Sequence, residues 1–270
     1  MPLRLIVTTA VVLVAVAALV RYFEPRFAFF PTAGESTTPV ELGVAFESST
    51  IVTGDGERLR AWTLRHATPR AAVVYFHGNG GNLSMWLPVL VGLHRRGLTV
   101  HAIDYRGYGA STGRPSESGL YRDVDATLDW VSARLDRGIP LVYWGRSLGT
   151  TMAAYAASRR RPAGLILEAA FPDARAVLRA SPPLAVFGLF ASYRFPTATY
   201  AQHAQCPILL LHGDDDHVIP YALGRALYEG LPEPRTFVRI RGGDHNDVVP
   251  ADSETYWTAV RTFIDQLGRM

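Results

Sequence analysis

Hydrophobic residues from about position 44 to the C-terminus follow two patterns that alternate along the chain. Short continuous apolar runs are typical of parallel strands buried on both faces. Longer stretches between them have apolar residues at helical spacing. This alternation predicts an α/β fold with a mostly parallel central sheet and helices on both faces. The predicted strands are 71–76, 99–103, 141–144, 165–167, 208–211 and 236–240, and the predicted helices are 82–96, 116–137, 148–160, 221–229 and 253–267.

Two segments depart from this alternation. Residues 44–52 and 59–64 flank Thr53-Gly54-Asp55-Gly56, a strong turn signal, so a β-hairpin is predicted there. Residues 171–205 form an insertion before the strand at 208–211 that is too long for a simple connection. Its apolar stretch, 184–190, fits one helix packed on the sheet or a small cap that offers an apolar wall to a substrate. Both interpretations stay open.

The N-terminal segment differs from the rest of the chain. Residues 5–20 carry no charge, and Arg4 and Arg21 flank the run. Its length of about 16 residues is at the short end for a membrane span. It is slightly long for the apolar part of a signal peptide, for which Ala15-Val16-Ala17 offers a cleavage site. A core helix would carry a polar face. We favour an uncleaved anchor because the run continues past the cleavage site.

The predicted organisation is therefore an N-terminal anchor, or signal peptide, at 1–23, a tether at 24–43 and one α/β domain at 44–270 with a possible cap at 171–205. We expect the anchor to hold the protein in a bacterial inner membrane. Arginines on both sides of the apolar run nearly balance, so the positive-inside rule leaves the side of the domain open, with the extracytoplasmic side slightly favoured.

Composition narrows the function classes. The chain has 270 residues and a formal charge of +3, and every basic residue is an arginine. No basic stripe interleaved with aromatic residues is present in the sequence, so nucleic-acid binding is not expected. Cys206 is the single cysteine, so no intramolecular disulfide can form. Its position before a buried-looking strand indicates a small apolar core residue.

A pentapeptide of the form G-x-S-x-G follows the predicted strand 141–144. Gly145-Arg146-Ser147-Leu148-Gly149 would place Ser147 on a sharp turn from strand to helix, where a substrate can reach the hydroxyl. Side chains in place of either glycine would collide with the neighbouring strand or helix. The motif predicts a serine nucleophile.

A serine nucleophile needs a base and an orienting acid downstream. Three carboxylates follow the strand at 208–211, and we select Asp216 over Asp214 and Asp215, which spacing alone leaves open. His245, on a glycine-rich loop after the last strand, is the predicted base. The remaining candidates are less suited by position: His212 ends a buried strand, His217 follows the acid too closely, and Asp244 adjoins the histidine.

Two backbone amides should form the oxyanion hole. One belongs to Leu148, directly after the nucleophile. The other is predicted at Asn79, on the loop 77–82 that follows the strand at 71–76. That loop lacks the G-x-G-x-x-G spacing of a nucleotide-phosphate cradle. The sequence also contains neither the H-E-x-x-H motif of zinc enzymes nor a paired Cys/His cluster. We expect no metal and no cofactor.

These residues resemble the α/β-hydrolase superfamily, and more narrowly the membrane-anchored α/β-hydrolase domain-containing group that includes depalmitoylases, with its bacterial relatives. The family pattern places the acid four residues after the histidine of an H-G-x-x-D segment, which supports Asp216. The N-terminal cysteine cluster of the palmitoyl-protein thioesterases is missing, so that role does not transfer. The segments that match the family are His77-Gly78-Asn79-Gly80, Asp104 to Ser111, Gly113 to Glu117, Gly119 to Asp123, Gly145 to Gly149 and Gly242 to Asp247.

The function expected from these features is hydrolysis of carboxylic esters or thioesters through an acyl-enzyme on Ser147. A small or lipid-like acyl ester is the expected substrate, and the membrane is the expected partner of the N-terminal segment. Two alternatives remain. A peptidase or amidase would use the same triad, and a membrane-tethered binding protein would have kept the fold without catalysis.

Overall fold

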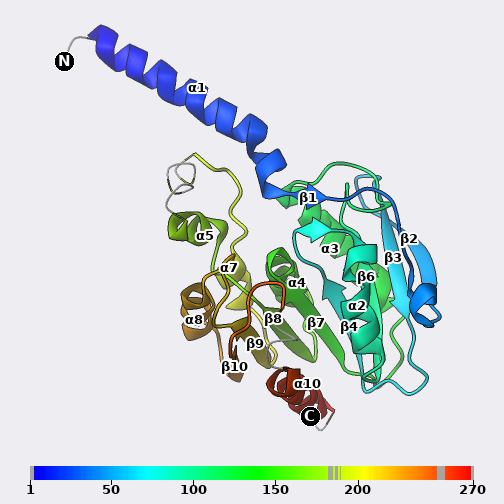
Figure 1. Ribbon diagram of the computed structural model, residues 1–270. Helices are drawn as coiled ribbons and strands as arrows, with labels where there is room; N and C mark the ends of the chain where they lie inside the picture. The colour runs from blue at the N-terminus through cyan, green and yellow to red at the C-terminus, as the bar shows by residue number, and fades with distance from the viewer. Residues whose placement is uncertain (1–2, 182–184, 186–187, 189, 248–252, 269–270) are drawn as a thin grey trace.

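A computed structural model describes residues 3–181, 185, 188, 190–247 and 253–268. It is built around one eight-stranded sheet (Figure 1). The strands are β2 (Glu47–Val52), β3 (Arg58–Leu64), β4 (Ala71–Phe76), β6 (Leu98–Ile103), β7 (Leu141–Arg146), β8 (Gly164–Glu168), β9 (Ile208–Gly213) and β10 (Arg235–Ile240). Their order across the sheet is β10-β9-β8-β7-β4-β6-β3-β2. β3 pairs antiparallel with β2 and β6, and the remaining described pairings are parallel, which confirms the predicted sheet.

Helices cover both faces of the sheet, as predicted, and each face has its own apolar core. β4 is buried along its whole length and divides its side chains between the two cores: Val74 and Phe76 enter one, Val73 and Tyr75 the other. This alternation is the two-residue period of a strand. The first core contains side chains of α3 (Glu117–Ser132), α4 (Leu148–Arg159) and α8 (Tyr221–Glu229), and the second contains those of α2 (Leu83–His94) and α10 (Ser253–Leu267).

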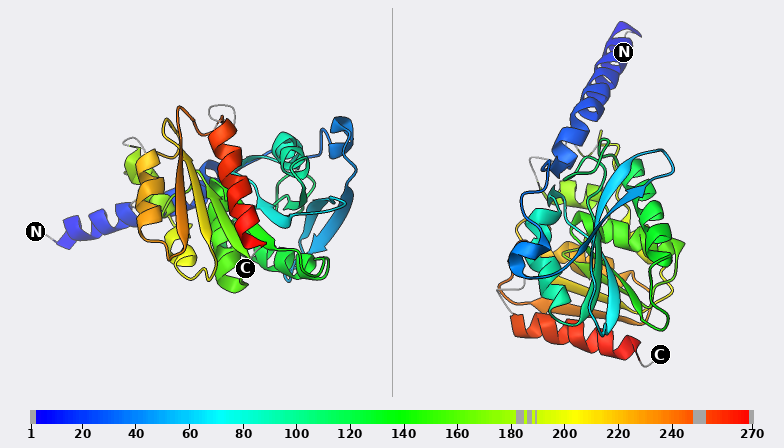
Figure 2. Two further views of the ribbon diagram at one scale, coloured as in Figure 1. Left: turned by 90° about the horizontal axis from the view of Figure 1, so that it is seen from below. Right: turned by 90° about the vertical axis from the view of Figure 1, so that its right-hand side faces the viewer.

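The helices predicted from positions 82 and 116 each begin after a residue whose side chain caps the helix. The side chain of Asn82 accepts a hydrogen bond from the Met85 amide at the start of α2, and that of Ser116 accepts one from the Gly119 amide at the start of α3. α3 ends at Ser132, five residues before the predicted end at 137, and the chain then turns toward Gly138, whose φ is +81°. This backbone conformation cannot continue a right-handed helix, but α3 already ends six residues before Gly138. Figure 2 shows α10 running across the face of the sheet.

The N-terminal helix α1 (Leu3–Ala28) projects away from the rest of the molecule (Figure 1). An 18-residue window of it has a mean hydropathy of 2.6 and is 0% buried, so α1 is long and apolar enough to cross a membrane. It continues five residues past the predicted end of the anchor at 23. The segment predicted as a tether is therefore helical up to Ala28.

The rest of that segment lies against the domain. Phe29 is buried, and β1 (Phe30–Pro31) pairs in parallel with β5 (Gly80–Gly81), on the loop predicted to carry the oxyanion hole. A short 3-10 helix, η1 (Pro39–Leu42), follows. These backbone contacts were not visible in the sequence because they join residues about 50 positions apart.

The insertion between β8 and β9 contains α5 (Ala174–Ala180) and α7 (Thr197–Ala201). Most of the apolar stretch 184–190 lies outside the described residues. The choice between a packed helix and a cap therefore stays a prediction.

Candidate active site

Ser147 lies on the turn between β7 and α4, at the carboxyl edge of the sheet (Figure 1). Its backbone has φ 52° and ψ −120°, a conformation that is strained for any residue other than glycine. The Ser147 amide donates a hydrogen bond of 2.9 Å to the Glu168 carbonyl, which ties the turn to the end of β8. The sequence motif thus folds into the predicted nucleophile elbow, with Ser147 9% exposed.

The two glycines of the motif are required by close backbone approach. A Cβ on Gly145 would lie 2.1 Å from the Gly149 carbonyl oxygen, and a Cβ on Gly149 would lie 2.0 Å from the Phe76 carbonyl oxygen. Both contacts are with backbone, which cannot move aside as a flexible side chain can. Close packing of α4 against β7 and β4 therefore depends on these glycines.

The structure brings together three side chains that are far apart in the chain. His245 Nε2 lies 3.1 Å from Ser147 Oγ, and His245 Nδ1 lies 2.8 Å from Asp216 Oδ2. Each of the three residues is less than 10% exposed. Both distances lie in the hydrogen-bonding range. This is the connectivity that a serine, a histidine base and an orienting carboxylate need.

Asp216 is held in its ionised form by its surroundings. Burial by itself would raise its pKa, but hydrogen bonding with His212 and His245 and with the Ile219 amide outweighs burial and lowers the pKa well below its usual range. Its Oδ1 accepts hydrogen bonds from the amides of Val218 and Ile219, at 2.9 and 2.7 Å. Both oxygens are therefore engaged, and Oδ2 points to the histidine.

The other predicted candidates for the acid have different partners. Asp214 pairs with Arg239 and accepts a hydrogen bond from the Gly242 amide at 2.7 Å. The Asp215 side chain is 67% exposed. Asp244 accepts hydrogen bonds from the amides of His217 and His245, at 2.9 and 2.7 Å, so it joins the two loops instead of orienting the imidazole.

The alternative histidines also occupy other positions. His212 is fully buried, and its Nε2 lies 2.9 Å from the Ile219 carbonyl. His212 Nε2 also lies 3.5 Å from Asp216 Oδ2, the carboxylate oxygen that faces His245. The His217 side chain is 71% exposed.

The two residues predicted for the oxyanion hole belong to the start of α4 and to the loop after β4. Leu148 is the first residue of α4, where helix geometry leaves backbone amides without intrahelical acceptors. Asn79 lies on the loop after β4. Its side chain donates to the Ala28 carbonyl at 2.8 Å and accepts from the Tyr108 hydroxyl at 2.9 Å. These bonds hold the Asn79 side chain in place, so the group predicted to bind the oxyanion is the backbone amide of Asn79.

Asp104 and Tyr105, in one of the segments that match the family, contact this loop. The Tyr105 hydroxyl donates to the His77 carbonyl at 3.0 Å. His77 is the first residue of this loop; its Nε2 lies 3.6 Å from Asp104 Oδ1, and both side chains are fully buried. Burial raises the pKa of Asp104 to about 7 and lowers that of His77 to about 4. Both groups are therefore shifted toward their neutral forms.

Sequence reasoning missed Arg146, the residue before the nucleophile. Its side chain is buried, and its Nη2 donates to the His245 carbonyl at 2.5 Å. The guanidinium also lies 3.5 Å from Glu168 Oε1 and 5.2 Å from the centre of the Trp86 ring. Arg146 therefore connects the serine turn to the histidine loop. The only signal in the sequence was a charged residue in the motif directly after a buried strand.

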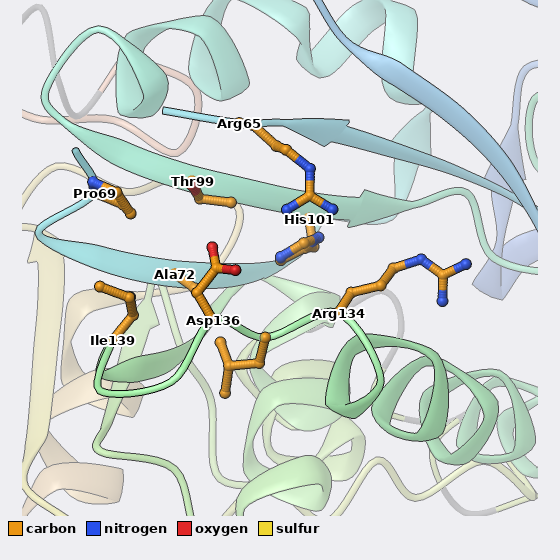
Figure 3. Close-up of a pocket in the computed structure, with 9 residues that line it drawn as sticks. Arg65, Pro69, Ala72, Thr99, His101, Arg134, Asp136 and Ile139 are labelled. Atoms are coloured by element: carbon orange, nitrogen blue, oxygen red, sulfur yellow. The ribbon is translucent and has the colours of Figure 1, made fainter. Parts of the chain in front are cut away.

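A small cavity lies at the opposite edge of the sheet, at the amino ends of β4 and β6 (Figure 3). Its volume is about 10 Å³, which accommodates about one water molecule. It is therefore no substrate site. Among the described residues, His, Cys, Asp and Glu side chains form no cluster of three or more that could hold a metal ion. The expected absence of metals and cofactors stays a prediction.

Comparisons with known proteins agree with this geometry. The family model described as "Serine aminopeptidase, S33" matches residues 67–203. An uncharacterized protein of Mycobacterium tuberculosis is 32% identical over 244 residues, covering 89% of this chain and 87% of the relative. An uncharacterized membrane protein of Saccharomyces cerevisiae is 32% identical over 239 residues, covering 86% and 84%.

Solved structures show the same fold. An esterase of Pyrococcus furiosus has a TM-score of 0.72 at 18% identity, covering 88% of this chain and 98% of that one. The α/β hydrolase GrgF from a Penicillium species has a TM-score of 0.67 at 18% identity, covering 84% and 100%. The nucleophile elbow, the matching family model and these relatives together show that the chain has the α/β-hydrolase fold and belongs to the serine aminopeptidase S33 family of hydrolases.

Proposed function

We propose that this protein is a serine hydrolase that cleaves carboxylic esters or thioesters through an acyl-enzyme intermediate. The observation that carries the proposal is the hydrogen-bonded series from Ser147 Oγ through His245 to Asp216, at 3.1 and 2.8 Å. Family membership supports hydrolysis in general, and the residues of the site support the serine mechanism.

The steps follow from the positions of the atoms. His245 Nε2 takes the Ser147 proton as Oγ attacks the substrate carbonyl. The carboxylate of Asp216 holds the imidazole through Nδ1 and stabilises the imidazolium that forms. The amides of Leu148 and Asn79 stabilise the negative oxygen of the tetrahedral intermediate. The imidazolium then protonates the leaving alcohol or thiol, and water repeats the sequence on the acyl-enzyme to release the acid.

An activity-based fluorophosphonate probe tests the nucleophile directly. The full-length protein should react with the probe and hydrolyse a nitrophenyl ester, whereas Ser147→Ala should abolish labelling and both Ser147→Ala and His245→Ala should lower ester turnover by several orders of magnitude. Ser253→Ala, which changes an exposed serine on α10, is the matched control. Unchanged turnover in either site variant with a native melting temperature would refute the assigned role.

A second candidate function is a peptidase or amidase on the same triad, because the matching family model is described as a serine aminopeptidase. Aminoacyl anilides and nitrophenyl esters distinguish the two. Turnover of anilides at a rate comparable with esters would support the peptidase. A non-catalytic binding protein would show neither activity and no probe labelling.

We further propose that α1 is a membrane anchor and that the substrate is a small or lipid-like acyl ester. The apolar, unburied surface of α1 supports anchoring, as does the membrane-protein name of the yeast relative. A reporter fused to the C-terminus would identify the side of the membrane that holds the domain.

A further inference from the structure

Four consecutive backbone amides in the insertion bind two carboxylates. We call residues 192–195 the strap. The amides of Ser192 and Tyr193 donate to Glu24, at 2.8 to 2.9 Å, and the Ser192 hydroxyl donates to the same carboxylate. The amides of Arg194 and Phe195 donate to Glu117, at 2.6 and 2.7 Å. Amide bonds to an ionised carboxylate are among the stronger hydrogen bonds in proteins.

The two carboxylates come from different parts of the molecule. Glu24 lies in the last turns of α1, after the apolar run, and Glu117 lies in the first turn of α3. The strap is therefore held between the helix that we propose to be the anchor and a helix of the central domain. Figure 1 shows the end of α1 and the insertion on the same side of the molecule, beyond the carboxyl edge of the sheet.

The residues directly after the strap contact α4, the helix that begins after Ser147. Two residues beyond Phe195, the hydroxyl of Thr197 lies 2.7 Å from that of Thr151, on the first turn of α4 and four positions after Ser147. Phe195 has φ +42°, which is unfavourable for a phenylalanine. Such a conformation persists where surrounding contacts enforce it, and the Glu117 carboxylate bonds its amide.

Aromatic packing joins the strap to α1 as well. The Phe29 ring lies 5.4 Å from the Tyr193 ring and 6.0 Å from the Phe195 ring, in edge-to-face arrangements. All three side chains pack in the core that includes Leu148, next to the nucleophile. The Ala28 carbonyl, between Glu24 and Phe29, also accepts the hydrogen bond from Asn79. The end of α1 thus contacts both the strap and the oxyanion loop.

We propose that Glu24 is a positioning residue: by holding the strap together with Glu117, it fixes the wall of the active site against which the acyl chain of the substrate packs. This inference rests on the proposed ester or thioester hydrolysis. The role of α1 then extends beyond anchoring, because its last turns form part of the active-site architecture. The proposal therefore predicts that long acyl chains depend on the strap more than short ones do.

Hydrogen exchange tests the strap independently of activity. In the full-length protein in detergent micelles, Glu24→Ala should accelerate exchange at the amides of Ser192 and Tyr193 by about tenfold or more, because their acceptor is lost. Glu24→Gln keeps an acceptor oxygen and should restore much of the protection. Glu254→Ala removes an exposed carboxylate from α10 and is the control. Unchanged exchange at both amides in the Glu24→Ala variant would overturn the proposed clamp.

Kinetics with nitrophenyl esters of increasing chain length test the effect on the reaction. Glu24→Ala should raise KM for the decanoate by about tenfold, with kcat for the acetate within about twofold of wild type. Glu117→Ala should give the same chain-length dependence. An equal loss of activity on the acetate and the decanoate, together with a lower melting temperature, would show a merely structural role and overturn the proposal. An unchanged KM for the decanoate would also overturn it.

The two proposals fail in different ways. Absence of ester turnover and probe labelling in the wild-type protein would refute the proposed function. If the wild-type protein turns over the decanoate and Glu24→Ala does so equally well, only the positioning role is refuted.

Discussion

Replacing Asp216 by asparagine would separate the shape of the carboxylate from its charge. Oδ1 of Asp216 accepts two backbone amides, at 2.9 and 2.7 Å, and Oδ2 faces His245 Nδ1 at 2.8 Å. An asparagine of the same shape would keep its oxygen on the two amides, because its NH₂ group cannot accept them. The NH₂ group would then face Nδ1 as a donor.

The consequence reaches the nucleophile through the imidazole. With a donor opposite it, Nδ1 must accept, so the ring proton moves to Nε2, which lies 3.1 Å from Ser147 Oγ. A protonated Nε2 cannot take the serine proton. Loss of the correct tautomer in a serine triad costs about 10⁴ in kcat, equivalent to about 5.4 kcal/mol of transition-state stabilisation.

The assay is turnover of 4-nitrophenyl butyrate by purified full-length protein, with thermal unfolding measured alongside. Asp215→Asn is the matched control because its side chain is 67% exposed, and it should retain activity within about twofold. An Asp216→Asn variant that unfolds normally and keeps more than about a tenth of wild-type kcat would contradict this reasoning, and another acid would have to orient His245.

Three further changes test the surrounding structure. Gly149→Ala places a Cβ 2.0 Å from a strand carbonyl oxygen and should lower the free energy of unfolding by about 3 kcal/mol or more. Gly54→Ala is the control: its Cβ would have no heavy atom within 4 Å, so the loss should be far smaller. Urea titration of both variants measures the difference. Arg146→Lys keeps the charge but loses the planar fork that reaches the His245 carbonyl, so kcat should fall by about tenfold with little change in melting temperature, and an unchanged kcat would refute the link. Burial raises the pKa of Asp104 to about 7, above the unfolded value of about 3.9, so the stability this group contributes is complete below about pH 4 and is lost as the pH rises through about 7. Asp104→Asn cannot titrate, so thermal unfolding from pH 5 to pH 8 should show wild type losing stability relative to this variant, and a constant difference would refute the shift.

Local sequence signals were sufficient for most of the framework. Continuous apolar runs identified the central parallel strands, because β4, β6, β8 and β9 are buried at every position. The G-x-S-x-G spacing located Ser147, because only glycine tolerates the close backbone approach on either side of the elbow. Asn82 and Ser116 marked helix starts through hydrogen bonds that span three residues. Each of these signals is carried by residues within a few positions of one another in the sequence.

Spacing alone could not distinguish residues that are chemically alike; the family resemblance supported one choice, and the tertiary structure shows the contacts of each. Asp214, Asp215 and Asp216 are identical in type and adjacent, and the loop decides which of them faces His245. The structure also showed that Arg146 bonds a carbonyl 99 positions away and that Glu24 bonds amides 168 and 169 positions away.

The physical reason is that hydrogen bonds between distant segments form only once the sheet has set their separation. Backbone amides and carbonyls, which every non-proline residue carries, supply one partner in these contacts, so no residue type in the sequence identifies them. Residues 24–43 show this most clearly: by composition they predict a tether, and the folded chain places them against the oxyanion loop and the strap.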